Sequence, residues 1–475
     1  MLPNPKLELI NSPSKSGEEI QYLFQGQSAG EIPHEEFEGK RETTVILRNG
    51  KQRIIFTGLG KKEKLSSVIV REATGVAIRQ LLSIGAEEIT LNLLGLSDHL
   101  ASAVEGALLA AYHFDDFKPA DRKRKNSLKI LRFMVLNSKS EEMQSALLRG
   151  KIFGESINHV RHLGNLPPNE VYPERMAEES IKLAMKWKLR CHIWDEKDLI
   201  KEGFGGILAV GKGSKSPPRF IELEYQGGKK NQKPIVVIGK AVTFDTGGIS
   251  IKPAASMEEM KYDKMGGCAV LGIMQAASRL KLPLNIIGLI PSVENMPSSN
   301  AYRPSDLVKS YDGKMIEVLN TDAEGRVILA DAIAYARIHL KPEWIVDFAT
   351  LTGAMIVALG TRRAGVFSNQ DSLRDLFCIA GHQSGDLVWP MPVGDEYDEQ
   401  IRSEIACVKN TGGRDAGSCT AASFLKTFAE ETPWVHVDIA GTATTAKALP
   451  CIEKGSTGFG VHLTIEALES WTKKN

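Results

Sequence analysis

Short apolar runs alternate with amphipathic helical stretches along most of this chain, and no other feature of the sequence restricts the fold so strongly. Beyond residue 160, the runs that predict β-strands are Leu189–Trp194, Phe220–Tyr225, Pro234–Gly239, Leu284–Ile290, Trp344–Ala349 and Trp434–Ile439. Helical stretches separate most of these runs, which is typical of βαβ units. We therefore expect a largely parallel sheet with helices on both of its faces.

The first 150 residues show the same alternation on a smaller scale. The predicted strands are Thr44–Leu47, Arg53–Phe56, Ile89–Leu94 and Leu128–Leu136, and the predicted helices are Ser66–Ser83 and His99–Tyr112. This pattern predicts a separate α/β domain.

A long helix is predicted at about residues 141–163 and marks the boundary between the two series. It ends before Pro167 and Pro168, because proline cannot continue a helix. A chain of 475 residues is also too long for one ordinary core. We therefore predict an N-terminal domain at residues 1–150 and a C-terminal domain at residues 151–475, with this helix as the linker.

The charge balance excludes a strong overall attraction to nucleic acid or to an anionic membrane. Lysine and arginine together number 59, and aspartate and glutamate together number 58. The basic run Lys118–Lys125 is interpreted as a solvated loop. Nucleic-acid binding is therefore possible but is not predicted.

No segment predicts export or membrane insertion. The N-terminus lacks the basic and apolar regions of a secretory signal, and the longest uncharged, mainly apolar run, Phe348–Gly360, is too short to cross a bilayer. Six scattered cysteines without a CxxC pair are typical of a reducing compartment. We therefore predict a cytoplasmic protein that makes no membrane contact.

Charged side chains gather where the predicted strands end. They are Lys240, Asp245, Lys252, Asp263, Asp322 and Glu324. The first three follow the strand at Pro234–Gly239 within one glycine-containing turn, and Asp263 is expected inside the first turns of the next helix. Sites in open α/β sheets lie beyond the carboxyl ends of the strands, so these side chains are expected to converge.

Converging carboxylates repel one another and need cations, protons or separation. Two bridged divalent metals would satisfy them, and oxygen ligands suit Mg²⁺, Mn²⁺ or Zn²⁺. Each piece also has a simpler interpretation. Thr321 and Glu324 fit a helix capping box, Asp245-Thr-Gly-Gly fits a simple turn, and Asp263 fits a solvated helix residue. The spacing alone leaves these alternatives open.

Asn320–Arg326, with the sequence NTDAEGR, resembles the signature of the leucyl (cytosol) aminopeptidase family. Gly239–Gly248, followed by Lys252 and Met260–Asp263, is similar to a second block of that family in order and spacing. Further similar segments are Asn165–Pro168, Ala349–Ala354, Asp438–Gly441 and Thr457–Gly460. The resemblance covers the chain beyond about residue 160, whereas the first 150 residues are only loosely similar.

The resemblance implies a centre of two divalent metal ions, Mn²⁺ or Zn²⁺, in each subunit. Asp245 and Glu324 would bridge the two ions. Lys240 and Asp263 would complete the coordination of one ion, and Asp322 would complete that of the other. A lysine ligand must be neutral, because an ammonium has no lone pair. Burial and two adjacent cations would lower the pKa of Lys240 enough.

The resemblance also implies the catalytic groups. Lys252 would polarise the scissile carbonyl and stabilise the oxyanion, and Arg326 would hold a bicarbonate ion that acts as general base. An apolar pocket for the first side chain would be lined by Met260, Thr350, Leu351 and Gly353. Met260 fits plain helix core equally well.

Together these features imply a metal-dependent aminopeptidase that releases N-terminal amino acids, preferably leucine and other apolar residues, by attack of a metal-bridged hydroxide. Its substrates would be peptides with a free N-terminus. The family relationship further implies a homohexamer, a macro-domain-like N-terminal α/β domain, and a C-terminal α/β/α domain with a mixed, mostly parallel sheet. Ala241, Thr246 and Val327 depart from the usual motif residues but are no proposed ligands.

Other function classes fit less well. Gly206–Lys212 nearly matches a phosphate-binding loop, but Gly213 stands where a serine or threonine would bind magnesium. The chain has no G-x-S-x-G elbow of a serine hydrolase. The remaining alternative is a binding protein built on the aminopeptidase scaffold.

Overall fold

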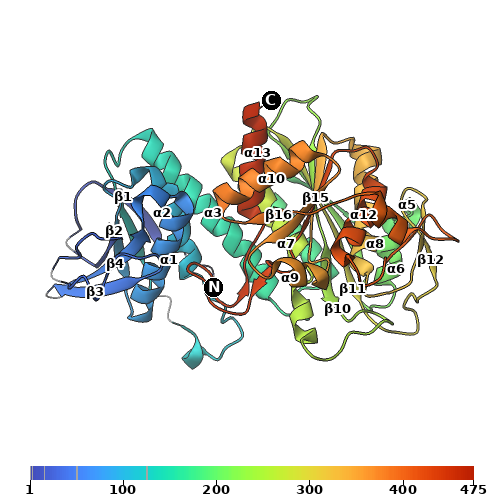
Figure 1. The fold of residues 1–475 in the computed structure, drawn as a ribbon, viewed down its shortest axis with the longest axis horizontal. Helices are drawn as coiled ribbons and strands as arrows, with labels where there is room; N and C mark the ends of the chain where they lie inside the picture. Colours follow the sequence, from blue (N-terminus) through green and yellow to red (C-terminus); the bar gives the residue numbers. More distant parts are fainter. Residues whose placement is uncertain are drawn as a thin grey trace. The chain divides into compact units, whose positions relative to one another are not determined.

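A computed structural model describes the chain except Met1, Pro3, Lys15, Glu31, Gly50, Lys51, Lys125, Asn126 and Asn475. The chain forms two compact units (Figure 1). The first comprises Met1–His159 and Thr445–Lys454, and the second comprises Val160–Thr444 and Gly455–Asn475. Within the described residues, no helix combines the length and apolar character that crossing a bilayer requires.

The first unit is built on a six-stranded sheet with the order β1-β6-β5-β2-β4-β3. Its strands are β1 (Lys6–Ile10), β2 (Glu18–Phe24), β3 (Thr44–Asn49), β4 (Gln52–Gly60), β5 (Glu88–Asn92) and β6 (Ile130–Met134). Only the pairing of β3 with β4 is antiparallel among these strands. The helices α1 (Ser67–Ser83) and α2 (Leu100–Ala111) bury their apolar faces with this sheet.

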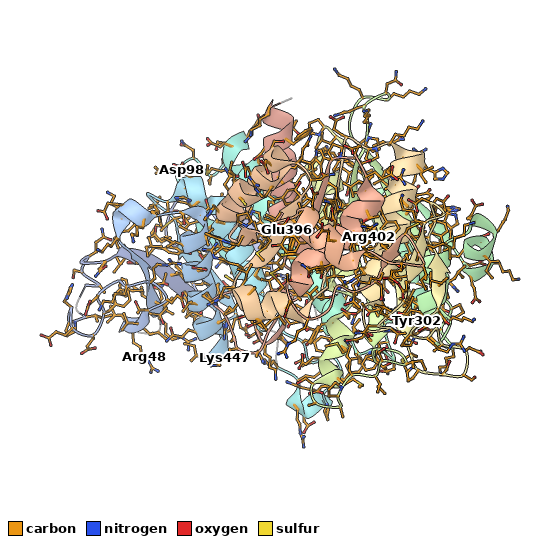
Figure 2. The ribbon with its side chains drawn as sticks, turned by 45° about the vertical axis from the view of Figure 1, so that its right-hand side comes forward. Arg48, Asp98, Tyr302, Glu396, Arg402 and Lys447 are labelled. Carbon is orange, nitrogen blue, oxygen red and sulfur yellow. The ribbon has the colours of Figure 1, made fainter. Side chains whose placement is uncertain are left out.

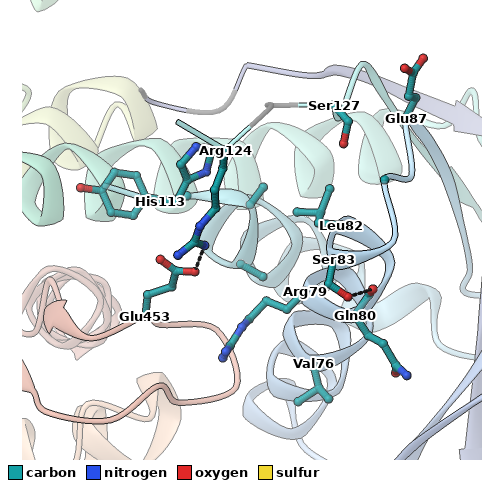
Figure 3. Close-up of a pocket in the computed structure, with 14 residues that line it drawn as sticks. Val76, Arg79, Gln80, Leu82, Ser83, Glu87, His113, Arg124, Ser127 and Glu453 are labelled. Carbon is teal, nitrogen blue, oxygen red and sulfur yellow. Dashed lines mark hydrogen bonds and ion pairs between the residues drawn. The ribbon is translucent and has the colours of Figure 1, made fainter. Parts of the chain in front are cut away.

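The segment Thr445–Lys454 completes the first unit although it comes late in the chain. Arg79 donates a hydrogen bond to the carbonyl of Leu449, and Arg124 forms an ion pair with Glu453. Arg79, Arg124 and Glu453 line a cavity of about 930 Å³ together with the ends of α1 and α2 (Figure 3). Part of the basic run predicted as a loop forms a 3₁₀ turn at Ala120–Arg122, and Lys125 lies outside the described residues.

The second unit contains a larger mixed sheet, with the order β16-β15-β18-β14-β9-β11-β8-β7 and with β10 paired to β11. The strands are β7 (Arg190–Trp194), β8 (Arg219–Gln226), β9 (Ile235–Gly239), β10 (Ala241–Asp245), β11 (Asn285–Asn295), β14 (Trp344–Ala349), β15 (Ala364–Ser368), β16 (Val388–Pro390) and β18 (Trp434–Asp438). The central pairings are parallel, and three outer ones (β7 with β8, β8 with β11, β15 with β18) are antiparallel.

Helices cover both faces of this sheet (Figure 1). α7 packs on one face with α4, α10 and α13, and α8 packs on the other with α6 and α12. The helices are α3 (Glu141–Asn165), α4 (Pro173–Trp187), α5 (Glu196–Glu202), α6 (Gly205–Gly211), α7 (Met265–Leu280), α8 (Glu324–Tyr335), α9 (Gly353–Leu359), α10 (Asp371–Ser384), α11 (Asp395–Asp398), α12 (Gly417–Ala429) and α13 (Val461–Lys474). The predicted α/β class with a mixed, mostly parallel sheet is confirmed.

The central strands β9 and β14 are buried at every position, because helices cover both faces. Asp347 therefore places a carboxyl group inside the sheet. It lies opposite His436 of β18, accepts a 2.6 Å hydrogen bond from the Nδ1 of that histidine, and accepts a 2.7 Å bond from the indole of Trp434. Burial opposes protonation of His436, but the charge and hydrogen bond of Asp347 outweigh burial and raise the pKa of His436 above its usual value.

We predict that the His436→Asn substitution destabilises the metal-free protein more at pH 6 than at pH 9. A raised histidine pKa adds stability that is fully present below the unfolded pKa of about 6.5 and is lost as the pH rises through the folded pKa. Breaking such a buried pair costs about 3 kcal/mol. Urea denaturation at both pH values measures the difference in unfolding free energy between wild type and variant.

His382 lies exposed on α10, so His382→Asn serves as the control and should leave stability unchanged at both pH values. An equal loss for His436→Asn at pH 6 and pH 9 would show that the charge of the histidine does not contribute.

A candidate metal centre at the strand ends

Lys240 and Asp245 reach one site from opposite ends of a short strand. Lys240 joins β9 to β10, and its backbone amide donates to the carbonyl of Phe348 on β14. Asp245 is the last residue of β10 and lies opposite Asn295, the last residue of β11. The prediction that both residues leave one strand within a single turn was wrong. The residues between them form a second strand, β10, which pairs with β11.

The turn after Asp245 holds that carboxylate in place. Asp245 Oδ1 accepts a 2.9 Å hydrogen bond from the amide of Gly247 and a 2.8 Å bond from the Nδ2 of Asn295. Gly247 has a φ of +85°, and a Cβ there would lie 2.4 Å from the carbonyl oxygen of Ser250. The turn that the sequence suggested as an alternative to a metal ligand is therefore present, and it orients the carboxylate of Asp245.

Asp263 lies between two helices rather than inside one. A 3₁₀ segment, η4, spans Met257–Tyr262, and α7 begins at Met265. The expectation that Asp263 belongs to the first turns of an α-helix was wrong, and so was its interpretation as a solvated residue, because its side chain is buried. Its Oδ1 accepts a 2.7 Å hydrogen bond from the hydroxyl of Thr350.

Asp322 lies in the loop that leads into α8, and Glu324 is the first residue of that helix. Thr321 anchors this loop: its hydroxyl donates to the carbonyl of Gly247 (2.6 Å), and its carbonyl accepts from Asn295 (3.0 Å) and from the hydroxyl of Tyr302 (2.8 Å). Tyr302 is labelled in Figure 2. The capping box is absent, since α8 begins after Ala323 without a side-chain cap. Thr321 therefore joins the two loops of the site.

Asp331 fixes the axis of α8, whose first residue is Glu324. The two oxygens of its buried carboxylate accept hydrogen bonds from the amides of Ile207 (2.9 Å) and Tyr311 (2.8 Å). Burial raises the pKa of Asp331 to about 7, against the effect of these bonds. This contact ties α8 to α6 and to the segment after β12 (Leu307–Lys309).

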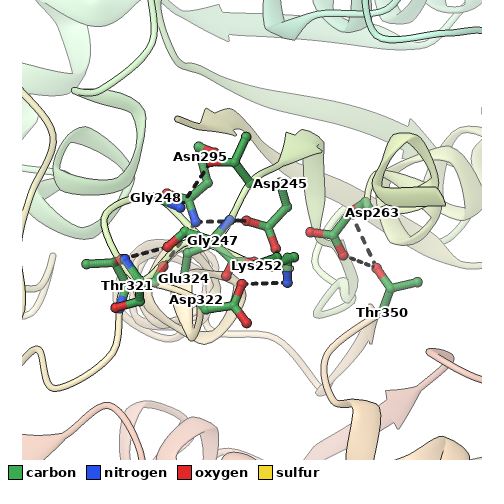
Figure 4. Close-up of polar contacts among 12 residues, drawn as sticks. Asp245, Gly247, Gly248, Lys252, Asp263, Asn295, Thr321, Asp322, Glu324 and Thr350 are labelled. Carbon is green, nitrogen blue, oxygen red and sulfur yellow. Dashed lines mark hydrogen bonds and ion pairs between the residues drawn. The ribbon is translucent and has the colours of Figure 1, made fainter. Parts of the chain in front are cut away.

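Figure 4 shows four of the predicted metal ligands in one region of the structure: Asp245, Asp263, Asp322 and Glu324. One oxygen from each of Asp245, Asp322 and Glu324 can be chosen so that all lie within 4.8 Å of one another. Two lysines pair with the acids. Lys252 Nζ lies 2.8 Å from Asp245 and 2.5 Å from Asp322, and Lys240 Nζ lies 2.8 Å from both Asp263 and Glu324.

Burial is the largest cause of the raised carboxyl pKa values in this cluster, and the two lysines offset it only in part. Burial and Asp245 raise the pKa of Glu324 to about 8, and burial raises the pKa of Asp263 to about 6 although Lys240 opposes it. Among the described residues, Glu324 Oε2 and Asp263 Oδ2 are buried without a hydrogen-bond partner. Unsatisfied buried carboxylate oxygens are ligands of the kind that divalent cations take, so the cluster fits a metal centre.

Lys240 remains charged in this arrangement. Burial lowers its pKa, but the charges of Asp263, Glu324 and Asp245 outweigh burial and raise the pKa above the usual lysine value. Its Nζ also donates to the carbonyl of Thr350, 3.1 Å away. Without bound cations, the ammonium therefore takes the place of a positive ion between two carboxylates.

Arg326 lies in the first turn of α8 with a buried guanidinium. Burial lowers the pKa of Arg326 to about 10, while Glu324 and Asp438 oppose that effect. Its Nε and Nη1 have no hydrogen-bond partner among the described residues. A buried guanidinium with two free donors suits a small planar oxyanion.

Of the four predicted pocket residues, Thr350 contacts the cluster, through Asp263 and Lys240. Leu351 follows it in the chain, and its amide donates to Asp438 Oδ1 at 3.2 Å. Gly353 is the exposed first residue of α9, and Met260 lies half-buried in η4.

The sequence patterns gave no role to Asn295, Tyr302 or Asp438, and they gave Thr321 only a capping role. Asn295 stands at the end of the apolar run that forms β11, so a longer predicted strand would have placed it beside Asp245. Asp438 ends β18 and holds the loop after β14 through Leu351 and the hydroxyl of Thr352 (2.7 Å). The position of Asn295 and Asp438 at strand ends was the signal that could have found these two residues.

Buried carboxylates and lysines meet at the carboxyl ends of the strands in an α/β/α domain. This arrangement is typical of enzymes that bind divalent metal ions. The model of the cytosol aminopeptidase family, catalytic domain, matches residues 158–465, and that of the family's N-terminal domain matches residues 10–120. The chain belongs to the cytosol aminopeptidase family. It is a metal-dependent hydrolase that acts on peptide N-termini, as the resemblance predicted.

Individual relatives agree with this assignment. The probable cytosol aminopeptidase of Cenarchaeum symbiosum is 47% identical over 419 residues, which cover 87% of this chain and 85% of the relative. That of Syntrophotalea carbinolica is 42% identical and covers 95% of this chain and 93% of the relative. A similar solved structure is the bottromycin maturation enzyme BotP in complex with Mn. Its TM-score is 0.88 at 30% identity, covering 96% of this chain and 99% of that one.

We predict that Gly325→Ala weakens divalent metal binding while it leaves the fold intact. A Cβ at Gly325 would lie 2.6 Å from Cε and 2.7 Å from Nζ of Lys240, so this lysine must move. The resemblance makes Lys240 a candidate ligand, and a change in the support of a ligand lowers metal affinity by roughly 10-fold or more. Calorimetric titration of the chelator-stripped protein with Mn²⁺ measures the dissociation constant of the metal.

Gly417→Ala is the matched control, because a Cβ there meets only Ala354 at an ordinary 3.4 Å. Equal Mn²⁺ affinities of the Gly325→Ala variant and the wild type would show that Lys240 takes no part in metal binding.

Proposed function

We propose that the cluster holds two divalent cations, Mn²⁺ or Zn²⁺, and that the protein releases leucine and other apolar residues from free peptide N-termini. The observation that carries this proposal is the convergence of Asp245, Asp322 and Glu324 within 4.8 Å, with buried oxygens of Glu324 and Asp263 left unsatisfied. The similar enzyme BotP is in complex with Mn, which supports Mn²⁺ as one of the metals.

The resemblance to the family supplies a role for each ligand. Asp245 and Glu324 would bridge the cations, Lys240 and Asp263 would serve one, and Asp322 the other. Cations at the cluster would remove the attraction between the carboxylates and the ammonium of Lys240, which raises its pKa in the structure. Lys240 would then contribute a neutral amine.

The cations, when bound, would lower the pKa of a water from 15.7 to about 7 and so provide hydroxide at neutral pH. Lys252 lies 22% exposed at the edge of the cluster, where its ammonium would polarise the scissile carbonyl and stabilise the charge that develops on its oxygen. The unpaired donors of Arg326 would hold a bicarbonate ion, which would take the proton of the attacking water.

The substrate groups would bind around the same residues. The free α-amine of the peptide would be a ligand of the centre, so an acetylated N-terminus would not be accepted. Thr350 contacts Asp263 of the cluster, and with Leu351, Met260 and Gly353 it would line the pocket for an apolar first side chain. We further propose that the protein acts in the cytoplasm as a homohexamer, as its family membership implies.

The proposed activity predicts metal-dependent hydrolysis of leucine p-nitroanilide. Chelator-stripped protein should be inactive, and Mn²⁺ or Zn²⁺ should restore hydrolysis, because the carboxylate cluster cannot activate water without cations. The release of nitroaniline measures the rate. Leucine anilide should be cleaved faster than glutamate anilide.

The N-acetylated leucine anilide is the control substrate and should not be hydrolysed under any condition. Folded, metal-loaded protein that cleaves neither substrate would contradict the enzymatic proposal. The remaining candidate would then be a binding role for the same scaffold.

We predict that Lys252→Met lowers kcat by about 10²- to 10³-fold, the usual effect of removing one group that stabilises an oxyanion. KM should change much less, since the ammonium acts mainly on the charge that develops during the reaction. Steady-state kinetics with excess Mn²⁺ measures both constants.

Lys309→Met is the control. Lys309 is exposed on β12, so this substitution should leave kcat and KM unchanged. A Lys252→Met variant with wild-type kcat would contradict the role of Lys252.

A further inference from the structure

Lys264 is a fully buried lysine whose charge is met by backbone oxygens alone. Its side chain is 0% exposed. Its Nζ donates to the carbonyls of Gly164 (3.2 Å), Leu166 (3.0 Å) and Lys261. No carboxylate among the described residues forms an ion pair with it. Buried lysines are usually paired with acids, so this arrangement requires an explanation.

The number of acceptors matches an ammonium. An ammonium carries three N–H donors, and the three carbonyls accept one each, whereas a neutral amine could satisfy only two of them. Gly164 and Leu166 lie at the end of α3, where helix carbonyls lack intrahelical partners and carry partial negative charge. The three carbonyls therefore form a small cation site, and the chain fills that site with its own side chain.

This site is adjacent to the segment that carries Asp263. Lys261 and Lys264 flank Asp263, so the hydrogen bond from Lys264 to the carbonyl of Lys261 closes the turn around it. The hydroxyl of Tyr262 contacts Asn165 Oδ1 at 3.4 Å, which also ties the turn to the end of α3. These hydrogen bonds fix the turn to the end of α3, and Asp263 Oδ1 lies 2.8 Å from Lys240 Nζ.

We infer that Lys264 is a positioning residue, a tethered cation that fixes the turn 261–264 against the end of α3 and so presents Asp263 to the metal centre. This inference rests on the proposed function in one respect, that Asp263 binds a divalent cation. It implies that an untethered small cation can replace the ammonium when the side chain is shortened.

The test compares two variants of the full-length protein at pH 7. Lys264→Ala removes the ammonium and opens space beside the three carbonyls, whereas Lys264→Met removes the charge but fills the space. Both should bind Mn²⁺ about 10- to 100-fold more weakly than the wild type, as expected when support behind a ligand is lost. Added n-propylammonium should restore the Mn²⁺ affinity of Lys264→Ala but not of Lys264→Met.

Calorimetry gives the Mn²⁺ dissociation constant, and steady-state kinetics with excess Mn²⁺ gives kcat and KM as a second readout. Asp386→Asn is the control for a loss of stability alone. Asp386 accepts hydrogen bonds from the amides of Gly460 and Leu463 at the start of α13, far along the chain from the ligands. This variant should melt at a lower temperature but should bind Mn²⁺ as the wild type does.

Wild-type Mn²⁺ affinity in folded Lys264→Met would overturn the inference, and this variant decides the question if Lys264→Ala does not fold. Rescue of both variants by n-propylammonium, or of neither, would also overturn it, because the effect would not then depend on an open cation site. A failure of the proposed function is distinguishable, since the wild type itself would not bind Mn²⁺.

Discussion

The ion pairs of Lys240 are the interaction on which the site depends. This lysine lies between two buried strands, and its ammonium contacts both Asp263 and Glu324 at 2.8 Å. Isolated buried carboxylates would repel one another and destabilise the fold, so the positive charge must be supplied from within the chain or by metal ions. The protein can therefore fold before it binds metal, because Lys240 and Lys252 offset part of the negative charge of the cluster.

The scaffold places these charges by contacts that lie outside the cluster. Asp331 fixes α8, Thr321 joins the two acidic loops, and Asp438 holds the loop of Thr350 and Leu351. Each of these contacts uses a buried side chain to bind backbone groups of a distant segment. Such contacts restrict the loops more than apolar packing would, because every donor or acceptor left unsatisfied in the interior is costly.

The sequence predicted the fold class, six strands of the larger sheet and every member of the carboxylate cluster, because apolar periodicity and strand-end acids are local signals. It could not predict β10, whose residues form a strand only because β11 lies beside them. It placed Asp263 in a helix because the 3₁₀ segment before this residue has helical spacing. Asn295 and Tyr302 were missed because their importance lies in one distant carbonyl, that of Thr321.

The return of Thr445–Lys454 to the first unit affects the order in which the protein can fold during synthesis. Residues up to His159 leave the ribosome first, but the segment that provides Leu449 and Glu453 follows only after almost the whole second unit. The first unit therefore remains incomplete until most of the second unit has been synthesised. A nascent chain stalled before residue 445 would expose the surface that this segment covers, and it would be recognised by chaperones as unfinished.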